Sequence, residues 1–169
     1  MLYHKAYELL KNSDSPKLMP DLCANLGDAY VFDNDLPKAA LWYRKALFIA
    51  DSLQLPKVQN ASLYMGLGRI YLLLEDFEAS LNCYQQTEKS FSDLSLNLQA
   101  YFLNNYGNYY YYTKDYQTSL KKFLMLKKLL EKHDKRETFS MYLCKLNLAD
   151  VYLNLNQLDL SDKCLDEVE

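Results

Sequence analysis

Three asparagines of the chain recur at one position of an internal pattern. Asn25, Asn105 and Asn147 each precede a small residue, glycine or alanine, by two positions. A side-chain carboxamide both donates and accepts hydrogen bonds, so it can pair with the main chain of an extended peptide whatever that peptide's sequence. The pattern is incomplete, because Gly66 stands at this position in the second unit. The alternative is that these asparagines are polar surface residues or bond to neighbouring helices.

Residue types that support catalysis are present but are not grouped. His4 and His133 are isolated on charged stretches, and the carboxylates are scattered, without a pair in an apolar setting. Gly66-Leu67-Gly68 has no predicted strand before it, unlike a phosphate-binding loop. The cysteines lack zinc spacing, and we expect small buried residues in a reducing compartment; they are Cys23, Cys83, Cys144 and Cys164. The sequence therefore predicts no enzyme, no metal site and no cofactor.

These residues belong to a unit of about forty residues that occurs four times. Each unit has a small residue, a second small residue twelve positions later and a large residue four positions after that. The first small residues are Gly27, Gly68, Gly107 and Ala149, the second are Ala39, Ser80, Ser119 and Ser161, and the large ones are Tyr43, Tyr84, Phe123 and Leu165. Repeats of this length indicate stacked units that cannot bury their apolar faces alone.

The apolar residues have helical spacing almost throughout, so each unit predicts two helices joined by a short polar turn. The predicted pairs cover 16–53, 57–92, 96–133 and 136–169; their first helices are 16–32, 57–74, 96–113 and 136–155, and their second helices are 36–53, 77–92, 116–133 and 158–169. Asp and Asn in the turns can cap the helix that follows. Pro16 and Pro56 are expected in first turns. Residues 1–12 have the spacing of a second helix without its partner.

This arrangement of small and aromatic residues resembles the tetratricopeptide repeat, a helix-turn-helix unit of about 34 residues. The resemblance covers nearly the whole chain. It implies an all-α, right-handed superhelical solenoid of antiparallel helix pairs, with about 3.5–4 repeats. The units are longer than usual, since the four first small residues are 41, 39 and 42 positions apart, and Trp42 is predicted on a second helix. Similar long repeats occur in kinesin light chains, polarity adaptors and bacterial sensor proteins.

The inner wall of such a solenoid is lined by the first helix of each pair. One helical stripe beside the core supplies the predicted binding residues, which are Asn25, Asp28, Phe32, Arg69, Leu73, Tyr101, Asn104, Asn105, Asn108, Tyr112, Asn147 and Asp150. The resemblance implies that the asparagines hold the backbone of a ligand. Arg69 is the only cation on this stripe, so we do not predict a clamp for acidic C-termini.

Four consecutive tyrosines, Tyr109 to Tyr112, cannot all face the core, because successive helical residues turn by about 100°. The repeat predicts Tyr110 in the core. Tyr111 and Tyr112 are then expected on the inner wall, or in packing against the next unit.

We expect a protein- or peptide-interaction module of a larger bacterial regulatory or sensor protein, which binds an extended peptide or a helix in its concave groove. The alternative is a structural spacer or a self-associating segment. Both ends lack a polar capping unit, so we expect a fragment of a longer array, or ends that stack on a second copy.

Charge and hydropathy limit the other partners. The net charge is −3, which provides no global basic field for nucleic acid. The basic stretch 121–136 leaves nucleic-acid binding as a third possibility, but a solvated convex face is the simpler explanation of it. No apolar run of about eighteen residues could span a membrane, and the N-terminus lacks a signal-peptide pattern. We therefore expect a cytoplasmic protein with neither nucleic-acid nor membrane partners.

Overall fold

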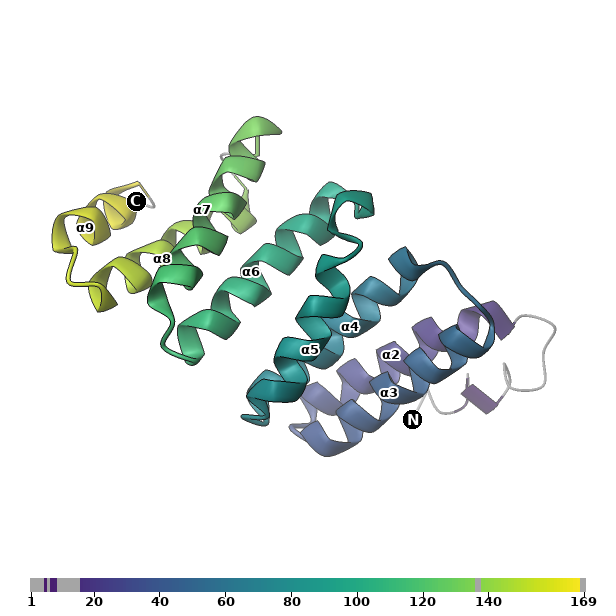
Figure 1. Ribbon diagram of the computed structural model, residues 1–169. Coiled ribbons are helices and arrows are strands. Elements are labelled where there is room, and N and C mark those ends of the chain that lie inside the picture. The colour runs from purple at the N-terminus through teal and green to yellow at the C-terminus, as the bar shows by residue number, and fades with distance from the viewer. Residues whose placement is uncertain (1–4, 6, 9–15, 136–137, 168–169) are drawn as a thin grey trace. The chain divides into compact units, whose positions relative to one another are not determined.

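The computed structural model describes residues 5, 7–8, 16–135 and 138–167, and these residues form helices and short connections without a strand (Figure 1). The chain divides into two compact units, Met1–Asp93 and Leu94–Glu169. Each unit contains two helix pairs, so the two units can be described and compared separately.

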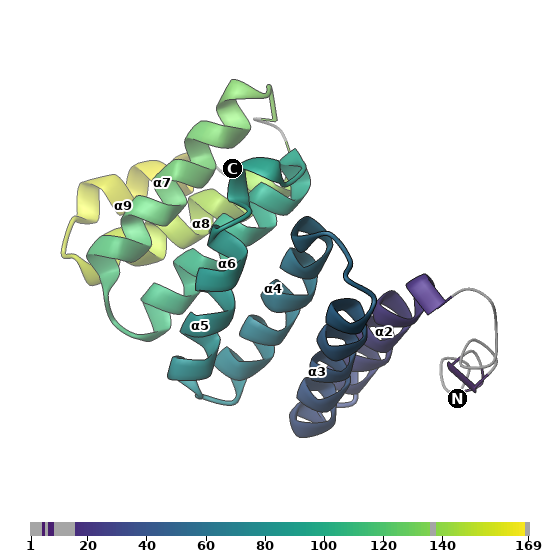
Figure 2. The ribbon, with the colours of Figure 1, turned by 45° about the vertical axis from the view of Figure 1, so that its right-hand side comes forward.

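The first unit begins with the 3-10 turn η1 and continues with four helices. They are η1 (Pro16–Leu18), α2 (Met19–Phe32), α3 (Leu36–Ser52), α4 (Lys57–Leu73) and α5 (Phe77–Glu88), followed by the short turn η2 (Phe91–Asp93). Successive helices pack side by side, α2 on α3, α3 on α4 and α4 on α5, and α2 also contacts α4. Figure 2 shows α3 lying alongside α2.

The second unit repeats this arrangement. Its helices are α6 (Leu96–Tyr112), α7 (Tyr116–Lys132), α8 (Phe139–Asn154) and α9 (Leu158–Asp166). Successive helices again pack together, and α6 contacts α8. The all-α arrangement of helix pairs predicted from the repeat is confirmed, whereas the handedness of a superhelix stays a prediction.

Some predicted boundaries are wrong. Helix α5 ends at Glu88, and the chain to Asp93 forms the separate turn η2. Pro16 lies in η1, while Pro20 occupies the first turn of α2, and Pro56 is the extended residue before α4. The predicted helix over 1–12 lies mostly outside the described residues, as do positions 136–137 and 168–169 of the last predicted pair.

The turns within the pairs share one backbone geometry. Each contains a non-glycine residue with positive φ, between 57° and 64°: Asn34, Glu75, Lys114 and Asn156. In the first three turns the next residue, an aspartate, accepts a hydrogen bond from a backbone N–H of the following helix at 3.1–3.2 Å; these residues are Asp35, Asp76 and Asp115. Such a cap stabilises a helix by about 1 kcal/mol. The fourth turn has Gln157 there and no side-chain cap.

Small residues hold the two helices of a pair close together. The buried hydroxyls of Ser80, Ser119 and Ser161 each donate to a main-chain carbonyl of the preceding helix at 2.9–3.0 Å. The large residues Tyr84 and Phe123 fill the space beside these contacts and are almost completely buried. The fourth large residue departs from the predicted pattern, because Leu165 is 44% exposed.

Candidate peptide-binding surface

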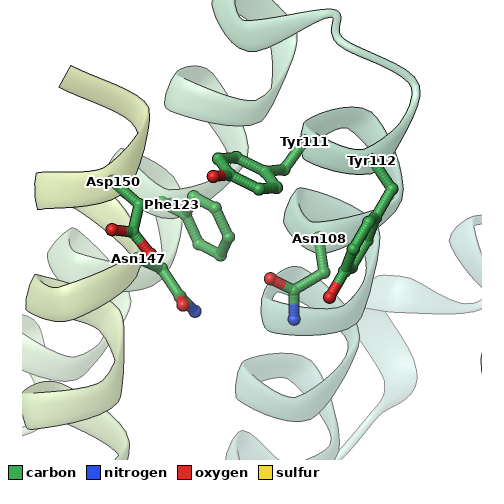
Figure 3. A pocket seen from close by; sticks show the side chains of 6 residues that line it. All are labelled: Asn108, Tyr111, Tyr112, Phe123, Asn147 and Asp150. Atoms are coloured by element: carbon green, nitrogen blue, oxygen red, sulfur yellow. The ribbon is translucent and has the colours of Figure 1, made fainter. Parts of the chain in front are cut away.

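A small pocket opens between the first helices of the second unit. Its cavity is about 90 Å³, and its lining residues are Asn108, Tyr111 and Tyr112 of α6, Phe123 of α7, and Asn147 and Asp150 of α8 (Figure 3). Small-molecule sites commonly have volumes of about 300–1,000 Å³. The pocket therefore suits a single side-chain head group rather than a whole cofactor.

Helical spacing brings these residues to one place. Tyr111 and Tyr112 follow Asn108 by three and four positions, which places all three on one face of α6. Asn147 and Asp150 are related in the same way on α8. Phe123 is only 1% exposed and forms the floor between the two helices. Its ring lies against Gly107, where an added Cβ would come within 2.7 Å of it.

Side-chain hydrogen bonds join α6 to α8 around the pocket. The Nδ2 of Asn147 donates to Oδ1 of Asn104 at 2.9 Å, and the Nδ2 of Asn154 donates to the Tyr111 hydroxyl at 3.3 Å. Asn154 also donates to the main-chain carbonyl of Asp150 at 2.8 Å. Of the three recurring asparagines, Asn147 thus bonds to a neighbouring helix.

The three asparagines at equivalent positions have three different environments. Asn25 is exposed on α2, and Asn147 bridges to α6. Asn105 is only 6% exposed, and its Nδ2 donates to the Tyr101 carbonyl of its own helix at 2.7 Å. Asn105 is therefore not an open wall residue, and the three carboxamides do not form a uniform row.

The corresponding place in the first unit is filled by the chain's own side chains. The Tyr43 hydroxyl donates to Oδ1 of Asp28 at 2.9 Å, and Nη2 of Arg69 lies 3.9 Å from the same oxygen. An added Cβ at Gly27 would come within 2.5 Å of the Tyr43 ring, and one at Gly66 would come closer still. The absence of asparagine at position 66 thus has a physical reason, because the ring of Tyr43 occupies that space.

Sequence reasoning placed Tyr43 in the core and missed the bond from its hydroxyl. Two differences between the units could have revealed it. The residue at the same repeat position in the second unit is Phe123, which has no hydroxyl, and Gly66 replaces the asparagine found at Asn147.

Apolar and aromatic side chains lie on the same first helices. Phe32 on α2 is 92% exposed and Leu73 on α4 is 51% exposed. In the second unit Tyr112 is 62% exposed at the rim of the pocket, while Tyr101, 42% exposed, lies outside the pocket lining. Each unit therefore presents aromatic or aliphatic area beside its polar wall residues.

The tyrosine run is arranged differently from the prediction. Tyr109 is the buried member, at 6% exposed, whereas Tyr110 is half-buried and donates its hydroxyl to that of Tyr106 at 3.1 Å. Tyr111 and Tyr112 line the pocket, and their rings meet edge to face with centroids 5.8 Å apart.

The four cysteines are free thiols and are buried, as the sequence predicts. Burial raises the pKa of Cys23 to about 11 and the pKa values of Cys83 and Cys144 to about 12. Burial also raises the pKa of Cys164. Thiols with raised pKa values carry little thiolate near neutral pH and are poor nucleophiles.

Two further findings concern metal ligands and membrane-spanning helices among the described residues. Within 5, 7–8, 16–135 and 138–167, no three histidine, cysteine, aspartate or glutamate side chains are grouped as metal ligands would be. No described helix combines the length and the apolar character needed to cross a membrane.

The basic stretch is partly engaged within the second unit. Lys127 pairs with Glu167 at 3.3 Å, and the Lys122 ammonium lies 4.3 Å from the centroid of the Tyr106 ring.

Comparison with known proteins gives two kinds of similarity. A family model described as tetratricopeptide repeat matches residues 61–87, which lie in α4 and α5. Among solved structures, BtubC (BKLC) from P. vanneervenii has a TM-score of 0.87 and 21% identity, covering 99% of this chain and 69% of that one. No protein of curated function matches the sequence significantly.

A second similar structure is a candidate kinesin light chain of Podosopora anserina, which has nearly identical TPR-like repeats. Its TM-score is 0.78 at 14% identity, covering 99% of this chain and 82% of that one. A single-residue variant of it gives a TM-score of 0.80 with the same identity and coverage. At these identities the similarity to solved structures concerns the fold.

Proposed function

We propose that the chain binds an extended peptide or a helix of a partner protein. One stretch of it matches the tetratricopeptide repeat, and its helix pairs have the fold of such repeats, which generally mediate protein–protein interaction. In the second unit the ligand lies against the first helices α6 and α8. The observation that carries this proposal is the open pocket between α6 and α8, lined by carboxamide, phenol and carboxylate groups.

Polar groups on the wall supply contacts to a peptide main chain. The structure gives no hydrogen bond from the side chain of Asn108 to another described residue, so its carboxamide can both donate to and accept from a ligand. Asn25 is exposed on α2 and has the same capacity. Such contacts recognise the backbone and leave the choice of sequence to the neighbouring side chains.

Exposed apolar side chains supply contact area. Tyr112 and Tyr101 in the second unit, and Phe32 and Leu73 in the first, are all more than 40% exposed. Tyrosine combines a large rigid surface with a hydroxyl and is enriched among residues that dominate binding energy. Each unit can therefore hold a short apolar motif beside main-chain contacts.

A direct test selects peptides from a random display library on the full chain and measures their affinity by calorimetry. Asn108→Ala should weaken a selected peptide by about 1–3 kcal/mol, the cost of leaving a bonded group unpaired. The matched control is Gln85→Ala, an exposed position on the second helix α5. Failure to enrich any peptide, or equal affinities for both variants, would contradict the proposal.

Self-association is a second candidate, favoured by exposed leucines on the last helix pair. Leu153, Leu158, Leu160 and Leu165 are 44–56% exposed. Light scattering across a concentration series separates the two candidate functions, because a monomer at all concentrations would exclude self-association.

The wider context belongs to the same proposal. We place the module in a larger regulatory or sensor protein, as the resemblance of its long repeats implies. The coding sequence on either side tests this placement. An output domain supports it, whereas further repeats alone would instead make the protein an adaptor or scaffold.

A further inference from the structure

The two units contain equivalent inter-repeat sites, and only one of them is filled by the chain itself. Equivalent positions are Asp28 and Asn108, Tyr43 and Phe123, Gly66 and Asn147, and Arg69 and Asp150. In the first unit, Asp28 and Tyr43 belong to the first helix pair, and Gly66 and Arg69 belong to α4, the first helix of the next pair. The equivalent residues of the second unit are distributed in the same way, over α6, α7 and α8. The comparison shows which groups the second site lacks.

The site of the first unit contains its own acid, cation and phenol. Asp28 accepts from the Tyr43 hydroxyl at 2.9 Å, and the Arg69 guanidinium lies 3.9 Å away. The ring of Tyr43 occupies the space beside Gly27 and Gly66. The inter-repeat site of the first unit therefore includes a guanidinium group, that of Arg69.

The site of the second unit lacks the cation and the phenol. Phe123 has no hydroxyl, and the position of Arg69 is taken by Asp150, which reverses the sign of the charge. Asp150 is exposed, and the structure gives its carboxylate no ion pair or hydrogen bond with another described residue. The result is the cavity of about 90 Å³ shown in Figure 3.

We infer that this pocket receives an arginine side chain of the bound peptide. The inference rests on the proposed function, and it names the side chain that selects the ligand. The guanidinium replaces the cation that the second unit lacks. It pairs with the Asp150 carboxylate and donates to Oδ1 of Asn108 on the opposite helix.

The aromatic groups of the pocket favour arginine over lysine. A guanidinium is planar, weakly hydrated and stacks on aromatic rings, whereas an ammonium is a compact and strongly hydrated charge. Phe123 forms the floor of the pocket, and Tyr111 and Tyr112 stand along the α6 side. Cations within about 6 Å of such ring centroids are attracted to their faces. The acceptors lie on two helices, which suits a group with donors in several directions.

The test uses the random peptide library on the full chain, with Asp150→Asn as the variant. Asp162→Asn is the matched control, since Asp162 is an exposed aspartate of α9 outside the pocket. We expect peptides selected on the native chain to share one arginine. Their affinity should fall about tenfold or more in Asp150→Asn and stay unchanged in the control.

A double-mutant cycle then links the two groups. Replacing the shared arginine by alanine should cost about tenfold on the native chain and much less on Asp150→Asn, because the pair is already broken. Arginine to lysine should lose part of the affinity. Additive effects in the cycle would overturn the inference.

The outcomes separate this inference from the proposed function. Peptides that bind but share no arginine, or that bind Asp150→Asn equally well, overturn the arginine pocket and leave peptide binding intact. A library that yields no binder removes both, because the pocket then has no peptide to select.

Discussion

Tyr43 donates its hydroxyl to Asp28 on the preceding helix at 2.9 Å, although the two residues are fifteen positions apart. The bond connects α3 to α2, where Nη2 of Arg69 on α4 also lies 3.9 Å from the same Asp28 oxygen. It is a feature of the first unit, since the equivalent ring of the second unit belongs to Phe123.

Removal of this hydroxyl should destabilise the first unit slightly. Tyr43→Phe loses one hydrogen bond to a carboxylate, which corresponds to about 1–2 kcal/mol in the free energy of unfolding. Urea unfolding followed by circular dichroism measures the change. Tyr112→Phe is the matched control, because Tyr112 is 62% exposed, and it should leave the unfolding midpoint unchanged.

Gly66→Ala should destabilise the chain, although alanine is the better helix former. The gain in helix propensity is at most about 1 kcal/mol. The new Cβ would collide with the Tyr43 ring, which cannot retreat because Gly27 lies against it too. Overpacking of this kind costs about 1–3 kcal/mol, which exceeds the gain in helix propensity.

The control for that substitution is Gly68→Ala. Its Cβ would lie 3.1 Å from the nearest atom, on the Tyr84 ring, so the clash and the propensity gain nearly cancel. Equal unfolding midpoints for the two variants would show that the close approach at Gly66 has no energetic consequence.

Ser119→Ala should cost about 1 kcal/mol in the free energy of unfolding, because the buried hydroxyl donates to the Gly107 carbonyl at 2.9 Å. Alanine fits this position sterically, since Ala39 occupies it in the first unit. The exposed Ser62→Ala should change stability less. A midpoint shift no larger than that of Ser62→Ala would argue against a stabilising bond.

Stability should decline in alkaline solution because the buried cysteines have raised pKa values. A thiol in the unfolded chain has a pKa of about 8.5, whereas burial raises the pKa of Cys83 and Cys144 in the folded chain to about 12. Above about 8.5 the unfolded state releases protons that the folded state retains, so the stabilisation present below that pH is lost as pH rises toward about 12.

Chemical unfolding between pH 7 and 10 tests this dependence. Cys144→Ala removes one of these groups and should flatten the alkaline slope, whatever its effect on stability at neutral pH. An unchanged slope would show that the thiols do not govern it.

Phe123→Tyr should close the pocket of the second unit. The added hydroxyl enters the cavity from its floor, where Tyr43 carries one in the first unit. Binding of arginine-containing peptides should weaken about tenfold, because a polar group occupies the space of the guanidinium. Calorimetry measures the affinity, and circular dichroism verifies that the helices remain.

The period of the repeat predicted the helix pairs because small residues recur where helices touch, at Gly68 with Ser80 and at Gly107 with Ser119. Local chemistry also predicted the aspartate caps. The details at the edge of the core were not predictable in the same way. Asn105 is buried whereas Asn25 is exposed, although both hold the same repeat position.

The physical reason is that this position borders the core. A small rotation of a helix, or one ring on a neighbouring helix, moves such a side chain from solvent to interior. The Tyr43 ring decides what fits at Gly66, yet the two residues lie on different helices. Sequence spacing within one helix contains no information about that ring, so the pocket emerged only from the folded arrangement.

Within each unit, a helix contacts mainly the helices next to it along the chain, such as α3 with α2 and α4. Contacts between segments close in sequence form with little loss of loop entropy. Each unit should therefore fold rapidly for its size, as proteins of low contact order do. Because each helix pair contacts mainly its neighbours, evolution can add or delete one helix pair while the packing of the other pairs stays the same.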